Sequence, residues 1–135
     1  MLTIRRDQME AFTRIQESRL VSELVAYVRR RFPDLAADEP DTELQARLRG
    51  ALSRARALGI RHARDVYRYT DLIGIFRWNF EEQPDYRWVT DILTDQRVTN
   101  PRRRLNRVID RHQARLATEQ HNREAEAKFS PGLLR

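Results

Sequence analysis

The sequence predicts an all-α protein, a compact bundle of four to five helices with a long C-terminal helix. Apolar residues recur every three or four positions through most of the 135 residues, which is the spacing that places them on one side of a helix. No run of roughly four to eight residues alternates β-branched and polar side chains between turn signals, as a half-buried strand would. Proline, glycine and asparagine fall between the periodic segments, where helices begin and end.

Two helices are expected in the first part of the chain. The first begins near Thr3, its N-cap, and ends near Pro33, because the residue before a proline is pushed out of helical geometry. The stretch PDLAADEPD is expected to be a connection. The second helix is capped by Asp41 and ended by Gly59, at a position where a left-handed residue costs little. The apolar rows of the two helices are Phe12, Ile15, Leu20, Val21, Leu24, Val25, Val28 and Phe32, and then Leu44, Leu48, Leu52, Ala55 and Leu58.

The middle of the chain predicts a third helix, an aromatic turn and a short fourth helix. The third helix covers residues 63–76, with Gly74 as a position of close packing. The aromatic turn follows, and the short helix covers residues 84–93. The side chains expected to face inward from the turn and the short helix are Phe80, Trp88, Ile92 and Leu93.

A long last helix opens at Asn100 and Pro101, an N-cap followed by a proline in the first turn. Beyond its apolar stripe the sequence ATEQHNREAEAKF is helix-prone but nearly without apolar anchors. We therefore expect one helical domain over residues 1–118 and a projecting or disordered C-terminal tail over residues 119–135. The stripe consists of Leu105, Val108, Ile109, His112 and Leu116.

The composition points to a soluble, cytoplasmic protein. The chain has no cysteine, so disulfides, thiol nucleophiles and thiolate metal ligands are excluded. No stretch approaches the roughly 18 apolar residues of a transmembrane helix, and the start MLTIRRDQMEAF lacks the apolar core of a secretory signal. The net charge is +6, but Lys128 is the only lysine among 26 basic residues. GC-rich coding produces such a preference for arginine, so the total charge carries little functional information.

The sequence carries no arrangement typical of catalysis, and we expect a non-enzymatic protein without a cofactor or a metal. None of His62, His112 and His121 lies in a nucleophile motif. His112 has charged neighbours on both sides, but a histidine that is satisfied on the flank of a helix explains it. The acidic pairs 38–39 and 81–82 fall in loops, where solvated carboxylates are ordinary, and the four glycines are too scattered to form a phosphate-binding loop.

Two groups of side chains are candidates for binding a partner. One is a basic ridge on the last helix, where arginines recur at helical spacing. The other is the aromatic turn, because Trp, Tyr and Arg are enriched among interface hot spots. For the ridge, a solvated or internally paired face, an acidic protein partner and nucleic acid all remain open. The candidate residues are Arg77, Trp78 and Tyr86 in the turn, and Arg103, Arg104, Arg107 and Arg111 on the ridge, which Arg115 continues.

The residues from Arg54 to Leu105 form a series of short motifs: R-A-x-x-x-G, then D-V-x-R-Y-x-D-L, then F-x-x-x-P-x-x-x-W-x-x-x-I-L, then R-L. This series resembles a family of small helical bacterial proteins, and the similarity extends over about residues 2–116. The family has a glycine and an acidic residue ahead of the turn aromatic, where this chain has the sequence RWN. The matching residues are Arg54, Ala55, Gly59, Asp65, Val66, Arg68, Tyr69, Asp71, Leu72, Phe80, Pro84, Trp88, Ile92, Leu93, Arg104 and Leu105.

The resemblance implies a genomic setting as well as a fold. Proteins of that family are encoded beside type VI secretion components, near spike proteins, spike tips and toxic effectors, and no activity is established for them. We therefore expect a cytoplasmic adaptor or chaperone that binds a secreted effector, toxin or spike-tip protein. The first alternative is an immunity protein that neutralises a cognate toxin. The second is a nucleic-acid-binding helical protein that uses the arginine ridge, and no membrane partner is expected.

Overall fold

The computed structural model describes the backbone of residues 2–133 and the side chains of residues 14–128. No strand occurs in this part of the chain, which confirms the all-α prediction. Helical structure comprises six α-helices and two 3₁₀ helices over the described residues. Their bounds are α1 Leu2–Arg31, α2 Pro33–Ala36, α3 Asp41–Ala57, α4 Ala63–Phe76, η1 Phe80–Glu82, η2 Pro84–Tyr86, α5 Arg87–Leu93 and α6 Pro101–Leu133.

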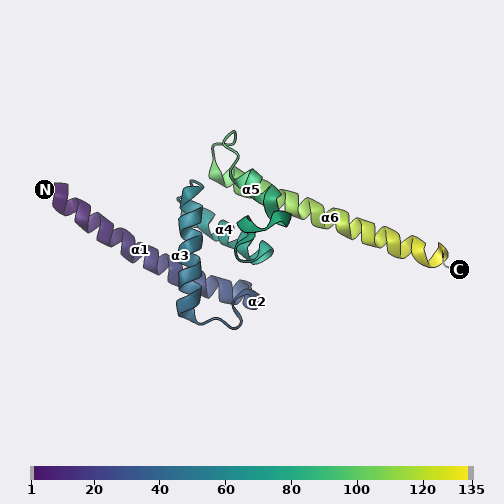
Figure 1. Cartoon of the computed structure of the whole chain (residues 1–135), viewed down its shortest axis with the longest axis horizontal. Helices are drawn as coiled ribbons and strands as arrows, with labels where there is room; N and C mark the ends of the chain where they lie inside the picture. The colour runs from purple at the N-terminus through teal and green to yellow at the C-terminus, as the bar shows by residue number, and fades with distance from the viewer. Residues whose placement is uncertain (1, 134–135) are drawn as a thin grey trace.

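The helices pack around α4, which contacts α1, α3 and α6 (Figure 1). The short α5 lies on α6 next to the two 3₁₀ helices. The inner halves of α1 and α6 belong to the core, and their outer halves project from it in opposite directions (Figure 1). The largest fully buried side chains are Tyr69, Phe80, Leu24, Leu44, Leu48, Ile60, Leu72, Ile73, Leu105, Val21, Val28 and Val89.

The connection expected after α1 contains a further helical turn, so the prediction of a simple connection was wrong. Pro33 opens α2 as its first residue, where its fixed φ suits a helix and its missing N–H costs nothing. Leu35 and Ala36 are buried against the core. Burial of these two side chains fixes a turn that the local sequence leaves open.

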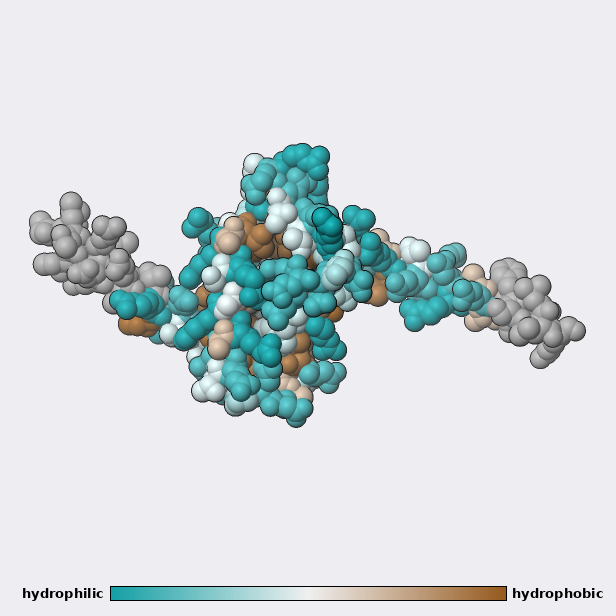
Figure 2. All heavy atoms as spheres, viewed as in Figure 1, coloured by the Kyte–Doolittle hydropathy of each residue, from teal (hydrophilic) through white to brown (hydrophobic). Residues whose placement is uncertain are grey.

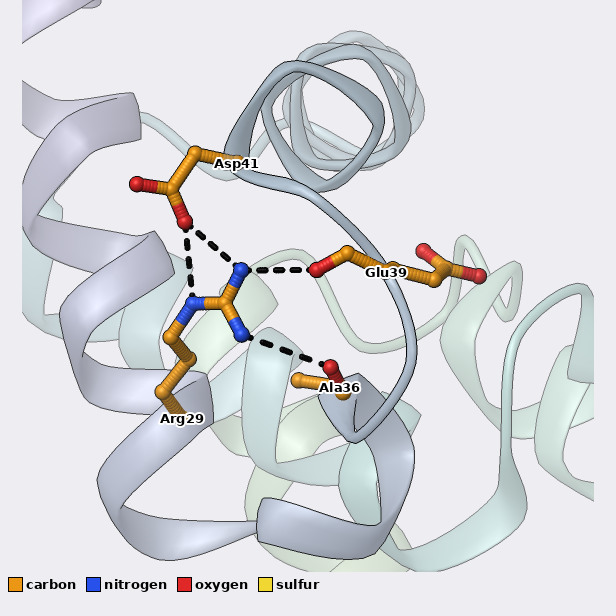
Figure 3. A network of polar contacts seen from close by, with 4 residues as sticks. All are labelled: Arg29, Ala36, Glu39 and Asp41. Carbon is orange, nitrogen blue, oxygen red and sulfur yellow. Dashed lines mark hydrogen bonds and ion pairs between the residues drawn. The ribbon is translucent and has the colours of Figure 1, made fainter.

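Arg29 ties the end of α1 to this connection (Figure 3). Its Nη2 donates to the carbonyl oxygen of Glu39 at 2.7 Å, and its Nη1 donates to that of Ala36 at 3.4 Å. Nε and Nη2 both donate to Oδ1 of Asp41, at 3.0 and 2.6 Å. The helix α3 begins at Asp41, and its N-cap is Pro40 and not Asp41 as the sequence predicted. The predicted capping role of Asp41 is replaced by this ion pair.

The bounds predicted for the third helix are those of α4, and Gly74 is a position of close packing. The Phe32 ring at the end of α1 lies where a Cβ on Gly74 would stand, so a larger residue there meets the ring directly. Phe32 in turn packs edge-on against Tyr27, with ring centroids 6.4 Å apart. Gly74 therefore lets α1 and α4 approach closely.

The helix α6 begins as the sequence predicts. The N–H of Arg102 donates to Oδ1 of Asn100 at 3.0 Å, and Pro101 is the first helical residue. Leu105 and Val108 are fully buried, whereas Leu116 is 47% exposed, so the stripe leaves the core within three turns. The helix continues through Leu133, beyond which the last two residues lie outside the described part of the chain.

The surface is mainly hydrophilic in the view of Figure 2, and apolar residues show in recesses between the helices. None of the described helices combines the length and the apolar character that a membrane crossing needs.

Candidate protein-binding surface

The two groups of candidate residues lie in different parts of the molecule. Trp78 faces the α2 and α3 side, where the guanidinium of Arg47 lies 5.3 Å from the centre of its ring. Its Nε1 is 3.5 Å from the carbonyl oxygen of Leu35, to which it donates. Trp78 is half-buried by these contacts and packs against the core. Its indole thus joins the turn to α2, and it does not extend the arginine ridge.

The other two candidates in the turn differ from each other in exposure. Arg77 is exposed and has a φ of 78°, the left-handed region that favours glycine. Asn79 also has a positive φ, 59°, but unlike Arg77, whose ψ is 170°, it adopts the left-handed helical conformation. Tyr86 is half-buried, and its ring centre lies 4.9 Å from that of Phe76. Tyr86 is therefore part of the packing around Phe76 as well as of the surface.

Arg104 is buried, so its assignment to the exposed ridge was wrong. Only 6% of the residue is exposed, and its Nη1 donates to the carbonyl oxygen of Leu93 at 2.7 Å. Arg102 is also engaged within the molecule, because its Nε and Nη2 donate to the two carboxylate oxygens of Asp65 at 2.9 and 3.4 Å. Arg102 and Arg104 differ from the exposed arginines of the ridge because their positions on α6 direct their side chains toward α4 and α5.

The rest of the ridge is exposed, and it lies against Trp88 of α5, which the sequence predicted to face inward. The guanidinium carbons of Arg111 and Arg115 lie 5.4 and 4.4 Å from the ring centre of Trp88 on α5. Trp88 is half-buried, whereas its neighbour Val89 is fully buried. We call the surface formed by Trp88, Arg107, Arg111 and Arg115 the Arg–Trp face.

One sequence signal could have indicated that Trp88 is only half-buried. Successive residues of a helix point about 100° apart, so a short helix that buries Val89 and Leu93 turns Trp88 toward its flank. The partners of Trp88 follow more than 20 positions later in the chain, and their proximity depends on how α5 packs on α6. Local sequence holds no information on that packing.

An aromatic group beneath the Arg–Trp face holds Trp88 in place. Phe76, at the end of α4, is buried and meets Trp88 edge-on, with ring centres 5.8 Å apart. The ring of His112 on α6 also packs against Phe76, with ring centres 5.2 Å apart. His112 is thus accounted for by packing on the flank of the helix. Such edge-on pairs stabilise the fold beyond the contribution of burying the rings.

The three arginines of the Arg–Trp face form no ion pair with the acidic side chains that the structure describes. Arg107, Arg111 and Arg115 are all exposed. Asp95 lies near the Arg107 end: hydrogen bonds from Arg97 lower the pKa of Asp95, and the charge of Arg107 lowers it further. The positive charge of Arg111 and Arg115 therefore faces solvent, with no ion-pair partner among the side chains of residues 14–128.

A half-buried acidic side chain, Glu81 of η1, contacts α4 elsewhere in the molecule. The hydroxyl of Tyr69 donates to Oε1 of Glu81, and Arg54 approaches Oε2 at 3.5 Å. Burial raises the pKa of Glu81, the charge of Arg54 opposes this, and Glu82 adds to it. Tyr69 is buried to 1% exposure, so the group fastens η1 onto the core and offers little surface.

Within the described residues, no three side chains among His, Asp and Glu come together in a way that could hold a metal ion. Comparison of the chain with models of protein families, with curated proteins and with solved structures finds no match.

Proposed function

We propose that this chain is a non-enzymatic adaptor or chaperone, and that it binds an acidic protein partner through the Arg–Trp face. The observation that carries the proposal is the arrangement of Arg111 and Arg115 on Trp88, since both arginines are exposed and neither has an acidic partner in the described part of the chain. Arginine and tryptophan are the side chains most often found at interface hot spots. Stacking on the indole also restrains two long side chains, which reduces the entropy lost on binding.

A protein partner is favoured over nucleic acid because few arginines of the ridge are available to bind a partner. Arg104 is buried and Arg102 is paired with Asp65, so the ridge is reduced to four exposed arginines. The charge of Arg107 also acts on an acidic residue of the same molecule, since it contributes to the lowered pKa of Asp95. A phosphate backbone carries a charge every few ångströms and requires a long basic track. A short cationic surface around an aromatic ring fits a protein segment better.

The class of partner follows from the resemblance described above. The small helical bacterial proteins that the chain resembles are encoded beside type VI secretion spike and effector genes, so we propose a secreted effector or a spike-tip protein as the partner. The adaptor would hold it before export. An immunity protein that neutralises a cognate toxin is the alternative. It would use the same basic face to bind an acidic surface of the toxin.

The test is co-purification of the tagged chain with the products of its neighbouring genes, after nuclease treatment and over a salt series. We expect one protein to remain bound in a fixed ratio, and to be lost when Arg111 and Arg115 are both changed to Glu. Matched reversal of Arg19 of α1 and Arg64 of α4, two exposed arginines that are not part of the Arg–Trp face, controls for net charge and should retain the partner. Retention by the Arg111 and Arg115 variant would overturn the proposal.

Co-expression then separates the two roles. An immunity protein rescues cells from the toxicity of the partner, whereas an adaptor raises the level or export of the partner without rescue. If nuclease treatment removes everything that is bound, the arginines serve nucleic acid and the adaptor proposal fails.

A further inference from the structure

We infer that the occupant of the Arg–Trp face is an acidic amphipathic helix of the partner, lying along α6 with two carboxylates one helical turn apart. The inference rests on the proposed function and names the chemistry of the partner segment. It is carried by the spacing of the arginines, by the way in which Trp88 holds two of them, and by a hollow beside them.

The spacing of the arginines matches a helix. Arg107, Arg111 and Arg115 are four residues apart on α6, a rise of about 6 Å between neighbours. Carboxylates at positions i and i+4 of a second helix are separated by the same rise. Two such carboxylates can therefore meet Arg111 and Arg115 simultaneously when the helices lie side by side.

The stacking of Arg111 and Arg115 favours carboxylate as the group recognised. A guanidinium that lies over an aromatic ring keeps its N–H donors at its edges, in the plane of the fork. The described residues offer these two side chains no hydrogen-bonded acceptor. Paired N–H donors in a plane fit the two oxygens of one carboxylate, and such charge-assisted pairs are among the stronger hydrogen bonds.

A shallow hollow continues the face toward the outer half of α6. It has a volume of about 360 Å³ and is lined by Ala114, Arg115, Thr118 and Glu119. The Thr118 hydroxyl donates to the carbonyl oxygen of Ala114 at 3.0 Å, so this polar group is already satisfied. The short side chains of Ala114 and Thr118 leave space beside Arg115 for a side chain of the partner helix.

These residues lie on one side of α6. At about 100° per residue, positions 107, 111, 114, 115 and 118 fall within an arc of about 100°. Acidic side chains bound the row, with Asp95 close to Arg107 and Glu119 one turn beyond Arg115. They would repel a continuous polyanion but leave room for two carboxylates between them. An acidic helix therefore fits better than a nucleic-acid strand.

The test uses labelled peptides and the whole chain. The probe is an alanine-based helix with the pattern Leu-x-x-x-Glu-x-x-x-Glu-x-x-x-Leu, which serves either direction of packing. A second peptide of the same composition has its two glutamates two residues apart, on opposite sides of the helix. A 15-nucleotide oligothymidylate is the phosphate probe. Circular dichroism confirms equal helix content of the peptides, and fluorescence anisotropy measures binding.

We expect the first peptide to bind at least about tenfold more tightly than the second. Changing Arg111 and Arg115 to Glu should weaken binding by at least about tenfold, whereas reversing Arg19 and Arg64 should change it less than about twofold. A peptide with lysines in place of both glutamates should bind the Arg111 and Arg115 variant better than the original peptide does. This exchange of charges also controls for loss of folding in the variant.

Equal binding of both peptides, no binding of either, or binding of the oligonucleotide alone would each overturn the inference. The proposed function is judged separately, by capture of the partner. Capture that depends on Arg111 and Arg115, together with failure of the helical peptide, would leave the adaptor proposal standing and reject the acidic helix.

Discussion

Arg104 of α6 donates a hydrogen bond from Nη1 to the backbone carbonyl oxygen of Leu93, the last residue of α5, at 2.7 Å. The contact is buried and links the C-terminal end of α5 to the first turns of α6. Arg103, one position earlier, is exposed. The two neighbouring arginines therefore have different roles, one in stability and one on the surface.

Changing Arg104 to Ala should lower the free energy of unfolding by about 2 kcal/mol, because it removes a charged donor and leaves the carbonyl of Leu93 buried without it. The same change at the exposed Arg103 should stay within about 0.5 kcal/mol. Urea denaturation followed by circular dichroism measures both. An equal effect at the two positions would contradict the structural role of Arg104.

Changing Gly74 to Ala should destabilise the fold by about 1–3 kcal/mol, because the added methyl group meets the ring of Phe32. Gly50 is the matched control. It lies within α3, and a Cβ there would meet only the flexible end of Arg54, at 3.4 Å. Gly50→Ala should therefore stabilise by about 0.5–1 kcal/mol. Thermal melts of the two variants should shift in opposite directions, and a stabilised Gly74→Ala would contradict the close approach of α1 and α4.

Changing Arg29 to Lys should destabilise by about 1 kcal/mol, although the charge is kept, because an ammonium group cannot donate to Asp41, Glu39 and Ala36 in the planar arrangement of Figure 3. The exposed Arg19 changed to Lys is the control, expected within about 0.5 kcal/mol. Unfolding in urea gives both values. If the two lysine variants were equally stable, the fork geometry at Arg29 would contribute nothing.

Changing Glu81 to Gln should alter how stability depends on pH. Burial raises the pKa of Glu81, so the folded chain holds this proton after the unfolded chain has lost it. As pH rises from the ordinary range of a glutamate, the unfolded state ionises first and the folded state loses stability relative to it. The unfolding free energy of the original chain, minus that of Glu81→Gln, should thus be larger at about pH 4 than at about pH 7. A difference that grows with pH would show that the Arg54 charge dominates instead.

The helices with strong local signals could be predicted from the sequence. The bounds of α4 follow from apolar spacing, and the start of α6 follows from an Asn100 side chain that caps its first turn. Gly74 was also recognisable, because a glycine costs helix stability relative to alanine, and close packing is a reason for one within a strongly periodic helix. The single turn α2 was missed, since only burial of Leu35 and Ala36 against other helices fixes it.

The candidate surface could be predicted only in part. Spacing placed Arg107 and Arg111 on one side of a helix, but it placed Arg104 there as well. Which flank of α6 is covered depends on where α5 packs, and α5 is separated from it by a loop whose path the sequence does not specify. For the same reason Trp88 was assigned to the core, although it packs between Phe76 below and two arginines above.

Because α1 and α6 project in opposite directions, the molecule is elongated (Figure 1). Its last helix alone is 33 residues long, or about 50 Å, and only its inner half packs on the core. The outer ends of the two helices lie at the two extremes of the molecule (Figure 1). A protein held at one end and a second protein held at the other would be kept apart by the length of the whole chain. The two projecting helices thus give a small helical core a long molecular axis.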